Sequence, residues 1–146
     1  MINEKSEQKW RRFNYISNEI NALFHEAALK MKMSDSELTI LYTICNEGNG
    51  CLLSEIYKSS GISKQTINSA VRKLEKEDIV YLKNLDGRSK KIFLTEKGQV
   101  EMETKVLRIL EMENEIFGSW TEEEQEMYVE LTQRFETSFR EKVKEL

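Results

Sequence analysis

A change of hydrophobic periodicity at residue 79 is the feature that most constrains the fold of this chain. Before it, apolar residues recur at the three- and four-residue steps of amphipathic helices. In IVYLKNLDGRSKKIFLT, residues 79–95, β-branched and aromatic residues take over, and an Asp-Gly pair typical of hairpin turns separates two apolar runs. The pattern predicts two strands, Ile79–Leu82 and Lys91–Leu94, joined as a hairpin.

Two short helices are predicted immediately before this hairpin. The first runs from Leu53 to about Ser59 and is closed by Gly61, because glycine takes the left-handed geometry of a helix end at little cost. Ser63 then caps a second helix that runs to about Asp78. Two helices joined by a tight glycine turn form a helix-turn-helix, and a hairpin directly after it is a wing.

Long helices are predicted before this lobe. Residues 6–31 carry apolar side chains at helical spacing, and Ser34 with Glu37 forms the capping box of a second helix, which stops at Gly48. The residues of that second helix expected to face the core are Leu38, Leu41, Tyr42 and Cys45.

Two more helices are predicted after the wing. Thr95 caps the first, which continues to Gly118, although Gly98 in its first turn disfavours it slightly. Thr121 and Glu124 form the capping box of the last. The predicted fold is mainly α with a small β-hairpin wing, a winged helix-turn-helix lobe flanked by long N- and C-terminal helices.

Length and charge bound the class of protein. At 146 residues one domain is expected. The net charge is −4, yet residues 54–98 hold ten lysines and arginines against six acidic residues, so that segment carries +4 and the remainder −8. Cations are concentrated in the lobe, as in a nucleic-acid-binding protein.

No apolar run reaches the roughly 18 residues of a membrane span, and the N-terminus lacks an apolar signal core, so a cytoplasmic protein is expected.

The helix GISKQTINSAVRKL, residues 61–74, has one polar and one apolar face. Gln65 and Asn68 have the paired donor and acceptor that adenine offers in the major groove, and Arg72 suits guanine or a phosphate. Serine and threonine hydroxyls on the same helix reach base edges or phosphates. The residues predicted to contact DNA here are Ser63, Lys64, Gln65, Thr66, Asn68, Ser69 and Arg72, and the buried face is Ile67, Ala70, Val71 and Leu74.

The wing supplies a second candidate contact. Its tip, DGRSKK, places Arg88, Lys90 and Lys91 on a projecting loop of the size that enters a minor groove. Asp86 is expected to hold the Arg88 guanidinium in a bidentate pair, which would reduce the side-chain entropy lost on binding. A polar helix face or a basic turn is common in any soluble protein, but the two in this order favour DNA binding.

These residues resemble the MarR family of winged-helix transcription regulators. The wing pattern D-x-R…L-T-x-x-G of that family is matched by Asp86, Arg88, Leu94, Thr95 and Gly98. Helix order and length also fit over nearly the whole chain. One departure is the residue after the recognition helix, where members commonly have glycine and this chain has an aspartate. That residue, Asp78, tolerates left-handed geometry better than most.

The resemblance implies a homodimer in which residues 1–33 and 99–146 form dimerisation helices and residues 34–98 form the DNA-binding lobe of a single domain. It implies a pseudo-palindromic duplex site, with the wing arginine in the minor groove and Asp86 supporting it. Half-sites would lie about 10 base pairs apart. Repression is expected, because a small dimer on a promoter blocks polymerase. In the family, a small aromatic or lipophilic effector, or oxidation of a cysteine, releases the DNA.

A pocket for such an effector has weaker support. Its candidate residues are Trp10, Phe13, Phe24, His25, Tyr42 and Tyr57, and ordinary core or dimer packing is the favoured explanation for each of them. Cys45 and Cys51 are the only cysteines, and Cys45 has no neighbouring cation in sequence to lower its pKa. Redox sensing by either is left open. With one histidine and two cysteines, no metal site or other cofactor is expected.

The sequence gives less support to two other classes of function, a protein-interaction module and an enzyme. A winged helix that docks a protein partner would bury aromatics at the centre of its surface, and DGRSKK has none. An enzyme would need a phosphate loop, a metal cluster or a nucleophile with its base, and the sequence offers none of these. A sequence-specific DNA-binding regulator is therefore the favoured hypothesis.

Overall fold

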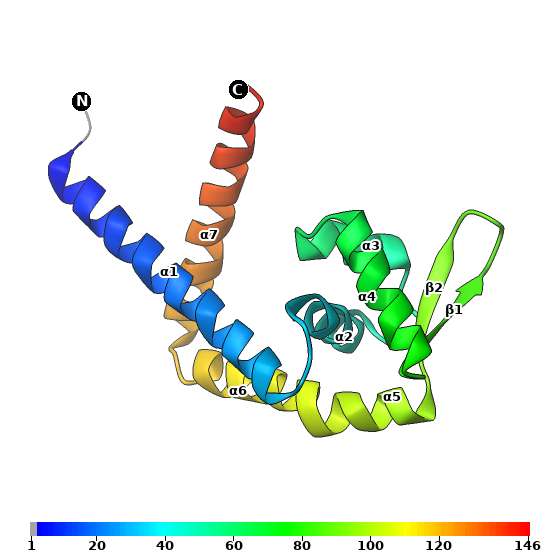
Figure 1. Cartoon of the computed structure of the whole chain (residues 1–146). Helices are drawn as coiled ribbons and strands as arrows, with labels where there is room; N and C mark the ends of the chain where they lie inside the picture. The colour runs from blue at the N-terminus through cyan, green and yellow to red at the C-terminus, as the bar shows by residue number, and fades with distance from the viewer. Residues whose placement is uncertain (1–2) are drawn as a thin grey trace. The chain divides into compact units, whose positions relative to one another are not determined.

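The computed structural model describes residues 3–146, and its elements follow the predicted order (Figure 1). They are α1 (Glu4–Lys30), α2 (Asp35–Glu47), α3 (Leu53–Ser60), α4 (Lys64–Lys76), β1 (Val80–Asn84), β2 (Lys90–Leu94), α5 (Glu96–Glu101), the π-helix η1 (Met102–Val106), α6 (Leu107–Gly118) and α7 (Glu122–Val143). The chain forms two compact units, Met1–Leu107 and Arg108–Leu146.

Helix α2 is the centre of the first unit and contacts α1, α3, α4 and η1. Because it is covered from several sides, it has no single core-facing stripe. Ile40, Leu41 and Ile44 are its fully buried apolar side chains. The expectation that Tyr42 and Cys45 face the core was wrong in this respect, since both are only half-buried.

The helix-turn-helix forms as predicted. Gly61 ends α3 at φ 65°, in the left-handed region, and the Ser63 hydroxyl accepts from the Thr66 N–H at 3.2 Å to cap α4. The apolar face of α4 is buried as expected, through Ile67, Ala70, Val71 and Leu74. This burial fixes which face of α4 remains exposed.

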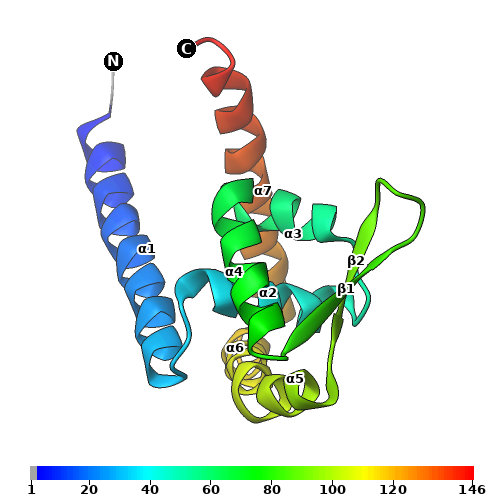
Figure 2. The same ribbon diagram turned by 45° about the vertical axis from the view of Figure 1, so that its right-hand side comes forward.

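The wing is a two-stranded antiparallel hairpin whose register runs from Val80 opposite Leu94 to Asn84 opposite Lys90. Residues 50–52 lie along β2: the Gly50 N–H donates to the Ile92 carbonyl, and the Ile92 N–H donates to the Cys51 carbonyl, both at 3.0 Å. Both ribbon views show the hairpin extending away from α3 and α4 (Figures 1 and 2).

The base of the wing is fastened to α5 by a close backbone contact. A Cβ on Gly98 would lie 1.9 Å from the Ile79 carbonyl oxygen, so only glycine fits there. Thr95 caps α5 by accepting from the Gly98 N–H at 2.9 Å, and its own N–H donates to the Ile79 carbonyl at 3.0 Å. Helix propensity alone disfavours Gly98, but it matches the wing pattern of the family that the sequence resembles, and the packing against Ile79 explains why glycine is required there. Asp78 takes φ 59°, the left-handed geometry expected of it.

One feature of this region was not predicted. The helix expected from Thr95 to Gly118 contains the π-helical turn η1, in which the Leu107 N–H donates to the Met102 carbonyl five residues back. Such turns are rare and depend on local packing, so the spacing of apolar residues does not reveal them.

In the second unit, the predicted capping box at the start of α7 is present, with the Thr121 N–H donating to Glu124 at 3.0 Å. An aromatic cluster of Phe117, Trp120 and Tyr128 joins the end of α6 to α7, with ring centroids 5.3 to 6.3 Å apart. The Gln125 amide donates to the Phe117 carbonyl at 2.9 Å. These contacts hold the turn between the two helices.

A buried carboxylate connects α2 with α4. Glu37, only 2% exposed, accepts from the Ser34 N–H at 2.7 Å through one oxygen and pairs with the Lys73 ammonium at 2.8 Å through the other. Burial opposes ionisation, but the Lys73 cation and the Ser34 N–H outweigh it and hold the pKa of Glu37 below its ordinary value. Glu37 therefore caps one helix and anchors another.

Replacing Gly98 should test the close contact at the wing base. We expect Gly98→Ala to lower the free energy of unfolding by about 1–3 kcal/mol, because Ile79 must move to admit the methyl group. Gly118→Ala is the matched control: no atom lies within 4 Å of its Cβ position, so stability should be unchanged or slightly raised. Thermal melts of both variants measure this, and equal melting temperatures would show that the contact is unimportant.

Replacing Glu37 by glutamine should remove the ion pair while keeping the cap. We expect a loss of about 1–2 kcal/mol at pH 7. Because the pKa of Glu37 is lowered on folding, its contribution is fully present above the unfolded value near 4.5 and is lost as pH falls through the folded value. Urea titrations from pH 7 to pH 3 should show wild type and Glu37→Gln converging at low pH; a constant gap would contradict the assignment.

Candidate nucleic-acid interface

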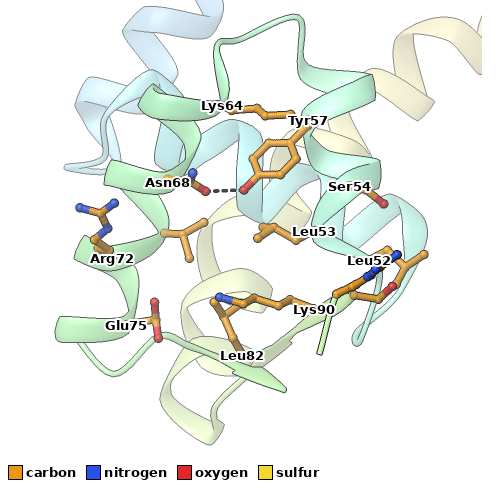
Figure 3. Close-up of a pocket in the computed structure, with 13 residues that line it drawn as sticks. Leu52, Leu53, Ser54, Tyr57, Lys64, Asn68, Arg72, Glu75, Leu82 and Lys90 are labelled. Atoms are coloured by element: carbon orange, nitrogen blue, oxygen red, sulfur yellow. Dashed lines mark hydrogen bonds between the residues drawn. The ribbon is translucent and has the colours of Figure 1, made fainter. Parts of the chain in front are cut away.

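Helices α3 and α4 and the wing together line a groove of about 520 Å³ (Figure 3). The groove contains Lys64, Asn68 and Arg72 from successive turns of α4, and Arg88 and Lys90 from the wing. The structure thus brings together five of the predicted DNA-contacting residues, although more than twenty residues separate the first from the last. Leucine side chains form much of its floor, and Glu75 is the acidic residue among those that line it.

The remaining predicted helix residues lie on α4 outside this groove, and all are exposed. Their hydroxyl groups already have partners: Ser63 and Thr66 are hydrogen-bonded to each other at 2.9 Å, and Ser69 donates to the Gln65 carbonyl at 3.0 Å. Gln65 is therefore the member of this set whose side chain has most freedom to meet an external group.

Lys91 does not lie at the wing tip as expected. It is half-buried within β2, opposite Lys83 and bridged to Leu52, because the strand begins one residue earlier than predicted. The cations at the tip end of the hairpin are thus Arg88 and Lys90.

Asp86 has a different role from the predicted one. Its carboxylate accepts from the backbone N–H of Ser89 at 3.0 Å and of Arg88 at 3.3 Å, and within residues 3–146 it makes no ion pair with the Arg88 guanidinium. These two hydrogen bonds, the Ser89 bond first, hold the pKa of Asp86 below its usual value. Asp86 therefore shapes the loop that carries Arg88 and does not orient the guanidinium directly.

Tyr57 also lies in this groove, and not with the other predicted effector residues. Its hydroxyl donates to the Asn68 Oδ1, and the Lys64 ammonium lies 5.4 Å from the centre of its ring (Figure 3). Sequence periodicity does not reveal this contact, because Tyr57 and Asn68 lie on different helices.

A second groove, of about 350 Å³, brings together Phe24, His25 and Tyr42 of the predicted effector pocket. It lies between α1 and α2, and Leu38 and Asp35 also line it. The His25 Nδ1 lies 2.8 Å from a carboxylate oxygen of Asp35. Trp10 and Phe13 lie elsewhere on α1, where their rings stack with centroids 5.0 Å apart.

The cysteines are held in an unreactive form. Burial raises the pKa of the Cys45 thiol, and burial together with Glu55 and Glu47 raises that of Cys51. Both thiols therefore stay protonated near neutral pH, which disfavours oxidation. In the described part of the chain no three histidine, cysteine or acidic side chains are grouped to hold a metal ion. No helix between residues 3 and 146 is long and apolar enough to cross a membrane.

Comparison with known proteins links this geometry to a family. Residues 32–89 match the family model described as the MarR family. A MarR protein from Peptoclostridium difficile aligns with a TM-score of 0.69 at 22% identity, over 97% of this chain and 94% of that one. No curated protein sequence matches the chain significantly.

Two further solved structures have bound molecules. The S. aureus MepR–DNA complex aligns with a TM-score of 0.65 at 22% identity, covering 87% of this chain and 95% of that one. The Streptomyces coelicolor PcaV regulator, in complex with its natural ligand, aligns with a TM-score of 0.62 at 17% identity, covering 85% and 91%. These similarities confirm the winged-helix fold with its flanking helices.

Replacing Asp86 by alanine should loosen the wing tip without unfolding the chain. We expect faster amide hydrogen exchange at Arg88 and Ser89, because both N–H groups lose their acceptor, and unchanged exchange in α2. Since the folded pKa of Asp86 is lowered, wild type should retain this protection near neutral pH and lose it as acid protonates the carboxylate. Exchange rates that do not differ between wild type and Asp86→Ala would contradict this role.

Proposed function

We propose that this chain is a member of the MarR family of transcription regulators and that it regulates transcription by binding specific duplex sites as a homodimer. The observation that carries the proposal is the groove in which Lys64 and Arg72 of α4 meet Arg88 and Lys90 of the wing. Cations from two elements far apart in sequence are gathered on one surface, as a polyphosphate backbone requires.

In the proposed complex, α4 enters the major groove and the wing reaches the adjacent minor groove. A helix fits the width of a B-DNA major groove, and an extended hairpin that ends in an arginine suits the narrower minor groove. Gln65 and Asn68 are the proposed base-reading residues, while the exposed hydroxyls of Ser63, Thr66 and Ser69 and the cations of Lys64, Arg72 and Lys90 lie near phosphates. The S. aureus MepR structure, which contains DNA, supports this use of the fold.

A dimer is proposed because each unit leaves apolar side chains in solvent. On α7, Leu131, Phe135 and Phe139 are 43 to 57% exposed, and on α1 Phe13, Ile16 and Ile20 are 46 to 49% exposed. Apolar surface on this scale usually marks an interface. A two-fold dimer would present two recognition helices to half-sites about 10 base pairs apart, and occupation of a promoter in the cytoplasm would repress it.

The groove between α1 and α2 is the proposed effector site. Phe24, Leu38 and Tyr42 give it apolar walls, and the His25–Asp35 pair gives it a polar rim. This combination suits a small aromatic or lipophilic compound. PcaV of the same fold was solved with its natural ligand, which supports the existence of such sites in the fold. Trp10, Phe13 and Tyr57 are not included in this site.

Duplex binding should weaken steeply with salt, because lysine and arginine displace counterions. We expect Arg88→Ala to lower affinity for all duplexes and to reduce the salt slope by about one, and Gln65→Ala to lower discrimination between sites by about 1–3 kcal/mol. Arg12→Ala on α1 makes the same change of charge outside the interface and should bind like wild type. Fluorescence anisotropy between 50 and 300 mM salt measures all three.

Selection of bound sequences from randomised duplex should yield a palindrome whose half-sites lie about 10 base pairs apart. Absence of any enriched sequence would overturn the proposal of a sequence-specific regulator. Enrichment of a single, non-repeated half-site would overturn the dimer alone.

A further inference from the structure

The contact between Tyr57 and Asn68 determines which atoms of Asn68 can reach a base. The Asn68 side chain is half-buried, and its Oδ1 accepts from the Tyr57 hydroxyl. The carbonyl oxygen is thereby directed at the Tyr57 hydroxyl on α3 (Figure 3), so the Nδ2 group, with its two hydrogens, is the part of the carboxamide that Tyr57 leaves for an external acceptor.

This geometry conflicts with the adenine contact expected of an asparagine on a recognition helix. Adenine offers an acceptor at N7 and a donor at N6, so it needs both ends of the carboxamide at once. Guanine offers two acceptors, N7 and O6, on the same edge. An outward Nδ2 group therefore fits guanine and leaves the adenine N6 hydrogens without a partner.

The residues of α4 on either side of Asn68 in this groove also present hydrogen-bond donors. Lys64, Asn68 and Arg72 are spaced four residues apart and line one groove from successive turns of α4. Lysine and arginine are donors only. With the Asn68 oxygen occupied, all three present hydrogen-bond donors.

Lys64 also supports the tyrosine. Its ammonium lies 5.4 Å from the centre of the Tyr57 ring, within the range of a cation–π contact. A cation over the ring draws electron density from it, which makes the phenolic hydroxyl a better donor and strengthens its bond to Asn68.

We infer that Tyr57 is a positioning residue for base readout: it holds the Asn68 oxygen on the side of α3, leaves the Nδ2 donors for the base, and so selects guanine over adenine at one position of each half-site. The inference rests on the proposed function, because it assumes that α4 lies in a major groove. It assigns a role in sequence choice to α3, which need not touch the base itself.

The test compares wild type with Tyr57→Phe, Asn68→Ala and the double variant. Site selection from randomised duplex, followed by affinity measurements on duplexes that differ at single positions, identifies the position where Asn68→Ala loses its preference. Wild type should prefer guanine over adenine there by about tenfold. In Tyr57→Phe the carboxamide is free to rotate, so the preference should shift toward adenine by a similar factor.

Three readouts separate positioning from a general structural effect. Tyr57→Phe should leave affinity for non-specific duplex and its salt slope unchanged. It should have no effect on base preference in the Asn68→Ala background, because it acts only through that side chain. Tyr15→Phe on α1, which removes a hydroxyl from a side chain 68% exposed, is the matched control and should select the same sites as wild type.

A second variant tests the inference without altering Tyr57. Asn68→Asp keeps an acceptor for the tyrosine and removes the outward donors, so it should lose the guanine preference. Identical base ratios in wild type and Tyr57→Phe, adenine preferred by wild type at the Asn68 position, or guanine still preferred by Asn68→Asp would each overturn the inference. If wild type enriches no sequence, the proposed function fails and the inference fails with it; enrichment with unaltered ratios overturns the inference alone.

Discussion

The ion pair between the buried carboxylate of Glu37 and the exposed ammonium of Lys73 links the central helix α2 to the recognition helix α4. One oxygen of Glu37 completes the cap of α2, and the other fixes the ammonium of a residue on α4. An ionised carboxylate that is nearly inaccessible to solvent is tolerated only when its partners are in place. One side chain therefore both caps the start of the central helix and contacts α4, whose apolar face packs against the core. The Lys73 ammonium is thus engaged in an ion pair within the protein, unlike the α4 cations that line the groove.

Local signals were sufficient to predict the order of elements. The capping boxes at Ser34 and Thr121, the left-handed glycine after α3 and the Asp-Gly turn of the wing each depend on residues a few positions apart. The structure confirms all of them, with boundaries that differ by one or two residues. The apolar face of α4 was predictable for the same reason. The buried residues of the central helix α2 were harder to predict, because burial from several sides is a property of the assembled unit.

The candidate site was predictable as a set of residues and less so as a set of contacts. The polar face of α4 and the arginine of the wing follow from periodicity and turn chemistry. Contacts between elements do not, as when Tyr57 reaches Asn68 from another helix. The choice of Asp86 between the Arg88 guanidinium and the backbone N–H groups of its own loop depends on the exact conformation of that loop. The steric need for Gly98 depends on where Ile79 lies, and the π-helical turn at Met102–Val106 depends on packing. The partners of Tyr57 and Gly98 lie in other elements, and the conformations at Asp86 and Met102–Val106 depend on the assembled structure, so these features require coordinates.

The pairing of residues 50–52 with β2 also affects how the protein behaves at high concentration. It covers one edge of β2, while β1 covers the other, so within the described wing the unpaired hydrogen-bonding edge belongs to β1. Open edges of this kind can recruit strands from other molecules and lead to aggregation. Here the edge is five residues long and carries Lys83, whose ammonium lies 5.3 Å from the ring of Phe93 and 5.8 Å from that of Tyr81. A short edge that carries a charged side chain is a poor template for pairing with strands of other molecules.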